Sequence, residues 1–245
     1  MIERPPQSGR LFFGDQVMTI SSALAGVVFD AYGTLFDVYG VQTELEARFP
    51  GKGRAIAEKW REKQIEYSRL RTMSSRYVDF WQITGDALDY SCEFSEAPLD
   101  AGARASLLAV YERLPPHPEV PGALRALVER GLTLAVLSNG NESMLNAALA
   151  AAGLRPLFAH VLSVERVRKF KTAPEAYQLG PDAFGRRASE LLFVSSNCWD
   201  VVGAAWFGYP AYWINRANSP AERLEAPAYA VGRTMNDLVA WLGDA

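Results

Sequence analysis

One acidic residue, Asp30, directly follows a short apolar segment that is expected to form a buried strand. The segment, Val27-Val28-Phe29, is apolar throughout, which is typical of a strand covered on both faces. Gly33 lets the chain turn sharply after the acid, and Thr34 places a hydroxyl group four residues beyond it. A carboxylate in this position could attack carbon or phosphorus and form an ester intermediate. It could also only cap a turn.

Four further side chains with hydroxyl or amide groups follow two other apolar segments. The segments are residues 132–137 and 191–194, and the side chains are Ser138, Asn139, Ser195 and Asn197. Each polar strand end, taken alone, is an ordinary beginning of a loop. In an open α/β sheet, however, the carboxyl ends of the strands share one edge, where ligands bind. The sequence therefore predicts that these side chains gather around Asp30.

Strands and helices alternate after residue 115, as expected for a parallel sheet. Strands are expected at residues 132–137, 160–164, 191–194 and 211–214. Helices are expected at residues 123–130, 142–152, 200–207 and 236–242, and from residue 174 to a break near Gly180-Pro181. With the strand before Asp30, this pattern predicts an α/β fold built on a doubly wound, Rossmann-like parallel sheet.

The stretch between the first strand and residue 115 is expected to be helical. Amphipathic segments cover residues 42–49, 53–73, 75–88 and 101–114. We therefore expect a helical cap domain at residues 38–114, inserted into a core domain formed by residues 23–37 and 115–245. Such a cap would exclude water from the catalytic edge and select the substrate. Residues 1–22 are expected to be an N-terminal extension, in which Met18 is an alternative start.

The composition excludes several classes of protein. Hydrophobic residues make up 49% of the chain and charged residues 22%, with a net charge of −3, so no basic surface for nucleic acid is indicated. No apolar run approaches the ~18 residues of a membrane span. Two cysteines and two histidines leave little for a disulfide framework or a transition-metal cluster. We expect a cytoplasmic protein without a cofactor, a membrane or a nucleic-acid partner.

The segment Asp30-Ala31-Tyr32-Gly33-Thr34-Leu35-Phe36-Asp37 resembles the first motif of the L-2-haloacid dehalogenases, a branch of the haloacid dehalogenase (HAD) superfamily. The resemblance extends to the C-terminus and implies a HAD-like fold with a cap after the first strand. It also implies hydrolysis of short-chain L-2-haloalkanoic acids to D-2-hydroxy acids with inversion. In that reaction Asp30 displaces halide from the substrate carbon, and water then hydrolyses the aspartyl ester.

The residues around the motif favour chemistry without a metal ion. Most members of the superfamily are phosphatases with a second aspartate two residues after the first, where this chain has Tyr32. The later segment 195–200 offers one acid, Asp200, rather than an adjacent pair. Magnesium in a phosphoryl-transfer site is held by several oxygen ligands, carboxylates among them. These residues therefore fit an attack on carbon better, because a halide leaves without needing a proton.

The resemblance assigns catalytic roles to nine side chains. Asp30 is the nucleophile and Thr34 supports it by hydrogen bonding, while Asn197 and Asp200 orient or activate the hydrolytic water. The full set is Asp30, Thr34, Arg61, Ser138, Lys171, Tyr177, Ser195, Asn197 and Asp200. Asp200 also has a simpler explanation as an acid that stabilises the start of a helix.

The lysine of the third motif has two candidates, Lys169 and Lys171. Lys171 is preferred because Tyr177 then follows at the family's spacing, and its expected role is to neutralise Asp30 and the substrate carboxylate. The family usually has proline after this lysine, whereas this chain has Thr172. Tyr177 is equally compatible with a helix residue that packs in the core.

A second set of residues is expected to bind the substrate and the halide. It comprises Tyr32, Arg61, Glu62, Ile65, Phe80, Ser138, Asn139 and Trp199. Arg61 matches a cap arginine that holds halide and steers the anionic substrate, which suits a permanent forked donor. A solvated helix face is the alternative for this arginine. Glu62 stands where the family often has glutamine, and its charge is expected to lower the positive potential of the pocket.

Two alternatives to the dehalogenase stay open at this point. One is a magnesium-dependent HAD phosphatase, which a chelator would inhibit. The other is a non-catalytic binding protein with the HAD fold, which would bind ligands without releasing halide. The expected partners are a haloacid, a halide ion and a second copy of the chain, since the cap is rich in aromatic residues.

Overall fold

The structure, a computed structural model, describes residues 24–226 and 228–243. The extension expected at residues 1–22 lies outside the described residues. Six strands form one parallel sheet in the order β3-β2-β1-β4-β5-β6. The strands are β1 (Gly26–Phe29), β2 (Leu134–Ser138), β3 (His160–Ser163), β4 (Leu191–Ser195), β5 (Ala211–Ile214) and β6 (Ala230–Gly232). The order reverses at β1, so the end of β1 is the switch point at which such sheets bind ligands.

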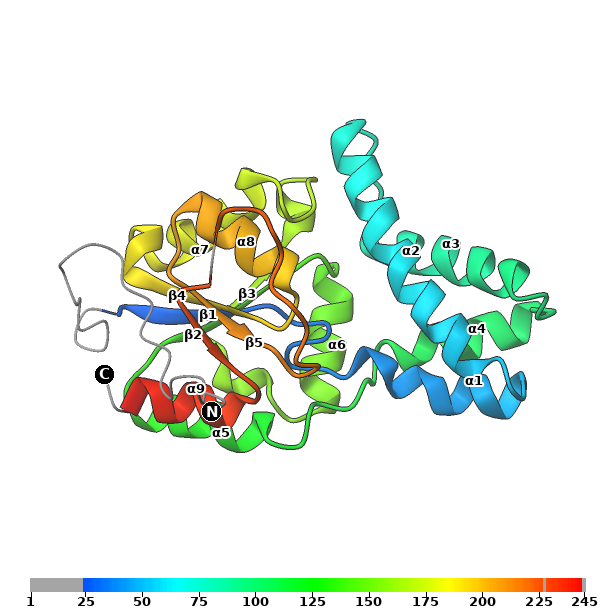
Figure 1. The fold of residues 1–245 in the computed structure, drawn as a ribbon, viewed down its shortest axis with the longest axis horizontal. Coiled ribbons are helices and arrows are strands. Elements are labelled where there is room, and N and C mark those ends of the chain that lie inside the picture. Colours follow the sequence, from blue (N-terminus) through cyan, green and yellow to red (C-terminus); the bar gives the residue numbers. More distant parts are fainter. Residues whose placement is uncertain (1–23, 227, 244–245) are drawn as a thin grey trace, which may run out of the picture.

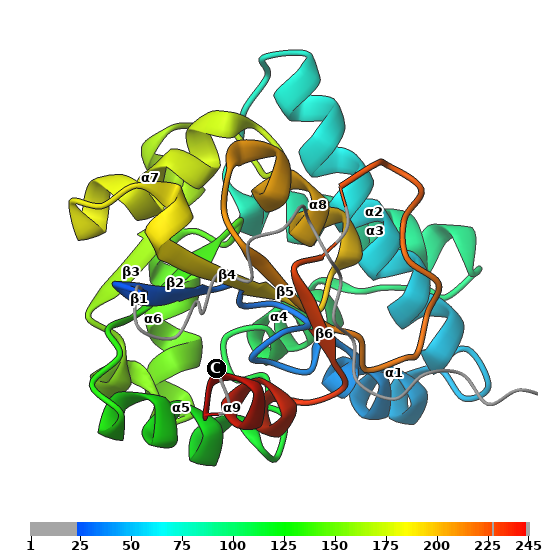
Figure 2. The ribbon, with the colours of Figure 1, turned by 60° about the vertical axis from the view of Figure 1, so that its left-hand side comes forward.

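Helices cover both faces of the sheet, which confirms the expected doubly wound α/β fold. Helices α7 and α8 lie on one face, and α5 and α9 lie on the other (Figures 1 and 2). The core helices are α5 (Val120–Glu129), α6 (Glu142–Ala151), α7 (Pro174–Phe184), α8 (Cys198–Phe207) and α9 (Met235–Gly243). No helix in the two described ranges is long and apolar enough to span a bilayer.

Helix α7 continues through Gly180-Pro181, so the break expected there is wrong. Pro181 has no N–H to donate to the carbonyl oxygen of Tyr177, one turn earlier. The hydroxyl of Tyr209 donates to that oxygen instead, at 2.7 Å. Gly180 leaves room for this hydroxyl, because a side chain there would collide with it. A tertiary contact therefore replaces the hydrogen bond that proline removes.

Four further helices lie between β1 and β2. They are α1 (Gln42–Arg48), α2 (Gly53–Met73), α3 (Phe80–Phe94) and α4 (Ala101–Val110). Helix α3 starts later than the expected 75–88, because Asp79 caps its N-terminus by accepting from the Gln82 N–H at 2.8 Å. It also ends later than expected, at Phe94. The short edge strand β6 was not expected, since three residues carry too little pattern.

Two connections join this helical bundle to the sheet, and they run side by side. The N–H of Asp37 donates to the carbonyl oxygen of Pro115 at 2.9 Å. Phe36 and Pro116 form an antiparallel bridge. Figure 1 shows the bundle beside the sheet, on the side where the blue strand β1 ends. The helices therefore lie next to the edge that carries Asp30.

Candidate active site

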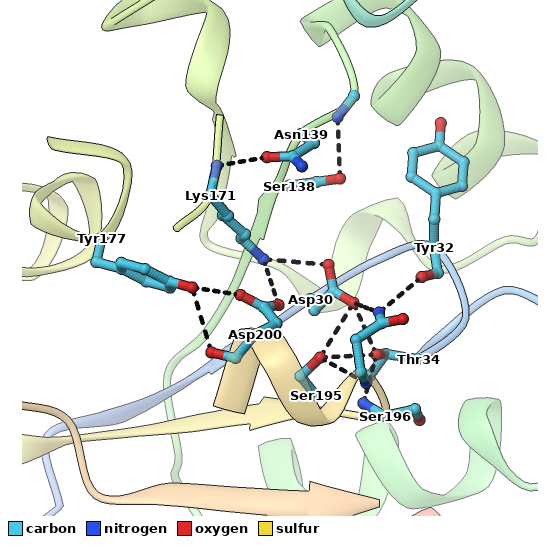
Figure 3. A network of polar contacts seen from close by, with 12 residues as sticks. Asp30, Tyr32, Thr34, Ser138, Asn139, Lys171, Tyr177, Ser195, Ser196 and Asp200 are labelled. Atoms are coloured by element: carbon cyan, nitrogen blue, oxygen red, sulfur yellow. Dashed lines mark hydrogen bonds and ion pairs between the residues drawn. The ribbon is translucent and has the colours of Figure 1, made fainter. Parts of the chain in front are cut away.

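The carboxylate of Asp30 is almost fully buried, and its two oxygens have different surroundings (Figure 3). Oδ2 accepts hydrogen bonds from Thr34 Oγ1 at 2.9 Å, Asn197 Nδ2 at 2.8 Å and Ser195 Oγ at 3.3 Å. Among the described residues, Oδ1 has one partner, the Nζ of Lys171 at 3.1 Å. Oδ2 is therefore saturated, whereas Oδ1 keeps lone pairs that are free to react.

The turn after β1 and the turn after β4 are bound to each other. Gly33 has a φ of 90°, which allows the sharp turn that brings Thr34 back to Asp30. Thr34 Oγ1 also accepts from the N–H of Ser196 at 2.8 Å. The N–H of Asn197 donates to Ser195 Oγ at 3.1 Å. Because β1 and β4 are neighbours in the sheet, these short bonds hold the three donors of Asp30 in place.

Lys171 lies between two carboxylates and is fully buried. Its Nζ is 3.1 Å from Asp30 Oδ1 and 2.9 Å from Asp200 Oδ2. Burial lowers the pKa of a lysine, but the two carboxylates outweigh burial here and hold the pKa of Lys171 above its ordinary value. Lys169, the other candidate, is exposed and pairs with Glu175 instead. The structure therefore brings Lys171, and not Lys169, to the nucleophile.

Asp200, at the start of α8, is the second carboxylate of the cluster and is wholly buried. Its Oδ1 accepts from the hydroxyl of Tyr177 at 2.7 Å, and its Oδ2 accepts from Lys171. Burial raises the pKa of Asp200 to about 6, while Lys171 and Tyr177 act in the opposite direction. Burial also raises the pKa of Tyr177 well above its ordinary value, so its hydroxyl stays protonated. Tyr177 thus reaches the site through Asp200 rather than by contacting Asp30.

Ser138 and Asn139 lie at the end of β2, beside β1 in the sheet. Ser138 Oγ accepts from the N–H of Gly140 at 3.1 Å. Asn139 Oδ1 accepts from the backbone N–H of Lys171 at 2.9 Å, so it positions the loop that carries the lysine. Figure 3 shows both residues above the Asp30 carboxylate. The strand ends therefore meet around one point, as their sequence positions indicate.

Arg61 extends from α2 toward the end of β1. One of its terminal nitrogens, Nη2, donates to the carbonyl oxygen of Tyr32 at 3.2 Å and approaches Asn197 Oδ1 at 3.5 Å. A small cavity lies between this arginine and Asp30, with a volume of about 10 Å³. Its walls come from the sheet edge and from the helical bundle. They are Asp30, Tyr32, Arg61, Ile65, Ser68, Phe80, Ser138, Asn139 and Trp199.

The match to a family model decides where this chain belongs. The model of the haloacid dehalogenase-like hydrolases matches residues 24–208. The chain belongs to this family. The match covers the sheet strands β1 to β4, the four helices of the bundle and every candidate site residue named above.

Several curated relatives of this haloacid dehalogenase-like hydrolase are dehalogenases. The (S)-2-haloacid dehalogenase of Pseudomonas sp. (strain YL) is 47% identical over 82% of this chain and 87% of the relative. Haloacetate dehalogenase H-2 of Moraxella sp. (strain B) is 43% identical over 85% of this chain and 93% of the relative.

Solved structures that are similar to this chain are also structures of dehalogenases. The crystal structure of an L-2-haloacid dehalogenase has a TM-score of 0.89 and 48% identity, covering 90% of this chain and 99% of that one. The L-2-haloacid dehalogenase of Xanthobacter autotrophicus with chloropropionic acid covalently bound has a TM-score of 0.84 and 36% identity, covering 90% of this chain and 98% of that one.

Two residues of this family member are placed differently from what the sequence indicates. Glu62, expected among the substrate-binding residues, is exposed, accepts from Lys59 Nζ at 2.7 Å and does not line the cavity in this structure. Neighbouring residues of a helix point ~100° apart, and only Arg61 of this pair faces the cavity. Ser68 lines the cavity but was not expected there. Ser68 follows Arg61 by two helical turns and so lies on the same face of the helix, which is the feature of the sequence that could have predicted its place in the cavity wall.

A magnesium ion does not fit the residues at this site. In the HAD phosphatases a metal ion is held by acids around the first aspartate, but Tyr32 replaces the second acid. The position between Asp30 and Asp200 is filled by the Lys171 ammonium, which contacts both carboxylates. In the described ranges, no three His, Cys, Asp or Glu side chains gather as a metal site. Lysine thus supplies the positive charge between the two acids.

Proposed function

We propose that this protein is an (S)-2-haloacid dehalogenase, which hydrolyses short-chain L-2-haloalkanoic acids to D-2-hydroxy acids and halide. The observation that carries the proposal is the unequal pair of oxygens on Asp30. Oδ2 is held by three donors, while Oδ1 has one partner among the described residues, Lys171, and Asp30 lines the cavity. Relatives at 47% and 43% identity with the names given above support the substrate class.

In the first step, Asp30 Oδ1 attacks the α-carbon of the substrate from the side opposite the halogen. The new C–O bond forms as the carbon–halogen bond breaks, and the halogen leaves with the electron pair, so the carbon inverts. Ser138 and Lys171 hold the substrate carboxylate. Arg61 and Asn139 stabilise the departing halide, because hydrogen-bond donors are strongest where charge develops. The covalently bound chloropropionic acid in the Xanthobacter autotrophicus enzyme supports an ester intermediate of this kind.

In the second step, water attacks Cγ of the aspartyl ester. Oδ2 is now the ester carbonyl oxygen, and negative charge develops on it within the hydrogen bonds of Thr34, Ser195 and Asn197. One water proton passes to Asp200 and reaches the departing hydroxy-acid oxygen by way of Lys171. The other proton stays on the regenerated carboxyl group and is released to solvent. Atoms and charge therefore balance without a metal ion.

The helices at residues 38–114 act, in this proposal, as a cap domain over the core domain proposed at residues 23–37 and 115–245. The cavity wall formed by Ile65, Ser68 and Phe80 comes from this cap, so the cap chooses the substrate side chain. The cap also keeps bulk water away from the ester, which strengthens every electrostatic interaction in the site.

We further propose a homodimer that forms through an exposed aromatic face of α2 and α3. Phe94 and Tyr90 stack with ring centres 6.1 Å apart and are exposed to 63% and 38%. Tyr67 meets Tyr90 edge to face, and Lys63 lies 4.5 Å above the Tyr90 ring. An exposed aromatic cluster of this kind is typical of an interface. Light scattering after gel filtration tests it, with Phe94→Glu expected to give monomers and Val128→Glu, on α5, expected to leave the dimer intact.

The test of the function is halide release from L- and D-2-chloropropionate, with and without EDTA. Release from the L-isomer alone, unchanged by EDTA and absent in Asp30→Asn, is the expected result. A single turnover in ¹⁸O-water should label Asp30 rather than the product, because water attacks the ester at Cγ. Release of phosphate from phosphoesters in a magnesium-dependent reaction, without halide release, would overturn the proposal.

A further inference from the structure

The cavity beside Asp30 is too small for the substrate of the proposed reaction. Its volume of about 10 Å³ is enough for one water molecule at most. A haloacid is several times larger than water. The structure therefore shows a closed form of the site, and part of the cavity wall must move before a substrate reaches Asp30.

One contact beside this cavity joins the helix α2 to the helix α8. The guanidinium carbon of Arg69 lies 5.0 Å from the ring centre of Trp199, and Trp199 is a wall residue of the cavity. Arg69 is exposed, and no carboxylate of the described residues lies within 4.0 Å of it. By contrast, Arg71 on the same helix pairs with Asp86 at 3.7 Å. Arg69 is thus held by an aromatic face rather than by an acid.

This arrangement leaves the positive charge of Arg69 available to an anion. An exposed cation over an aromatic ring is a weak contact, so it breaks easily. Arg61, the arginine inside the cavity, lies on the same helix two turns earlier, which corresponds to ~12 Å along the helix axis. Ile65 and Ser68 lie between the two arginines and line the cavity. The helix therefore presents one cation in the cavity wall, Arg61, and one against the wall residue Trp199, Arg69.

We propose that Arg69 is the first binding contact of the anionic substrate and that its stack on Trp199 closes the mouth of the cavity. The substrate carboxylate draws the guanidinium away from the ring, the mouth opens, and the substrate passes to Arg61 and Ser138. Arg69 then returns to Trp199 and closes the site for the reaction. The inference rests on the proposed function in so far as the substrate is a haloacid anion.

The test compares three variants in steady-state kinetics with L-2-bromopropionate. Arg69→Gln removes the charge, Arg69→Lys keeps it, and Arg54→Gln removes an exposed charge at the other end of α2, where Arg54 pairs with Glu58. At low ionic strength, Arg69→Gln should lower kcat/KM about threefold, because a unit charge ~6 Å away in water attracts an anion by roughly that factor. The loss should lie in KM, with kcat unchanged.

The charge origin of the effect predicts its response to salt and to the controls. Sodium sulfate at high ionic strength should remove the difference between Arg69→Gln and the parent, since exposed charges are screened. Arg69→Lys and Arg54→Gln should behave like the parent at low ionic strength. Equal kcat/KM values for Arg69→Gln and Arg54→Gln, or a fall in kcat as large as the fall in kcat/KM, would overturn the inference.

A binding measurement separates failure of this inference from failure of the proposed function. Calorimetric titration of Asp30→Asn with L-2-chloropropionate needs no turnover. Adding Arg69→Gln should weaken that binding about threefold at low ionic strength, whether or not the parent releases halide. Unchanged affinity in the double variant would overturn the role of Arg69, while halide release by the parent would still support the dehalogenase.

Discussion

Tyr177→Phe removes a hydroxyl group that helps to lower the pKa of Asp200, and it should therefore move the pH at which the proposed reaction becomes active. This hydroxyl donates to Asp200 Oδ1 at 2.7 Å, and both groups are buried. The bond favours the ionised carboxylate, so its loss favours the protonated acid and raises the pKa of Asp200. A hydrogen bond to a charged group contributes about 1.5–3 kcal/mol. At 1.36 kcal/mol per pKa unit, the expected rise is about one to two units.

The consequence is a shift in the acidic limb of the pH profile. Burial raises the pKa of Asp200 to about 6 in the parent protein, and in the proposed reaction its ionised form accepts the water proton. In Tyr177→Phe the limb of kcat/KM should move to between about 7 and 8. Halide release from L-2-chloropropionate between pH 4 and 10 measures this limb, because kcat/KM reports the ionisation of the free enzyme. At the alkaline end, the variant should recover most of the parent's activity.

A matched control removes a buried phenol that does not touch Asp200. Tyr209 donates to the backbone carbonyl of Tyr177 at 2.7 Å, so Tyr209→Phe changes the same region without changing the carboxylate. Its acidic limb should stay at the parent position. An activity loss in Tyr177→Phe that is equal at every pH, with no shift of the limb, would refute the reasoning.

Two further changes test the charges of the site. Lys171→Met leaves Asp30 and Asp200 without the cation between them, so the free energy of unfolding in urea should fall by about 3–5 kcal/mol at pH 8. The fall should be smaller at pH 5, where Asp200 takes up a proton. The control Lys169→Met, at an exposed pair, should stay within about 0.5 kcal/mol of the parent. Glu62→Gln should leave KM for L-2-chloropropionate unchanged, because this side chain points to solvent, and a clear fall in KM would return Glu62 to the pocket.

Much of the fold followed from local patterns in the sequence. Strand β5 and helix α2 have the expected bounds, because β5 is an unbroken apolar run of four residues and α2 is a long amphipathic segment of 21 residues. Helix α7 does not have the expected end, because the effect of Pro181 on the helix depends on whether another group replaces its missing hydrogen bond. Tyr209, which does so, lies far away in the sequence.

The sequence by itself determined which residues lie at the carboxyl ends of the strands, where the candidate site is. Asp30 follows the strand β1, Ser138 and Ser195 are the last residues of β2 and β4, and parallel strands place their carboxyl ends together. The resemblance to the L-2-haloacid dehalogenases then indicated that Lys171 and Arg61 belong to this edge, and that Tyr32 stands where the phosphatases have the second acid of the first motif. The placement of the strand ends needs only the alternation of strands and helices, whereas the placement of Lys171 and Arg61 needs the resemblance, because neither residue follows a strand.

Only the tertiary structure shows where each member of two neighbouring pairs points, although the spacing to Tyr177 already favoured Lys171 over Lys169. Lys169 and Lys171 carry the same charge in the same loop, yet one is exposed and one lies between two carboxylates. Glu62 and Arg61 are adjacent on α2, yet the helix directs them to different sides. Local sequence sets a residue's chemistry, whereas its direction depends on packing between segments that lie far apart in the chain.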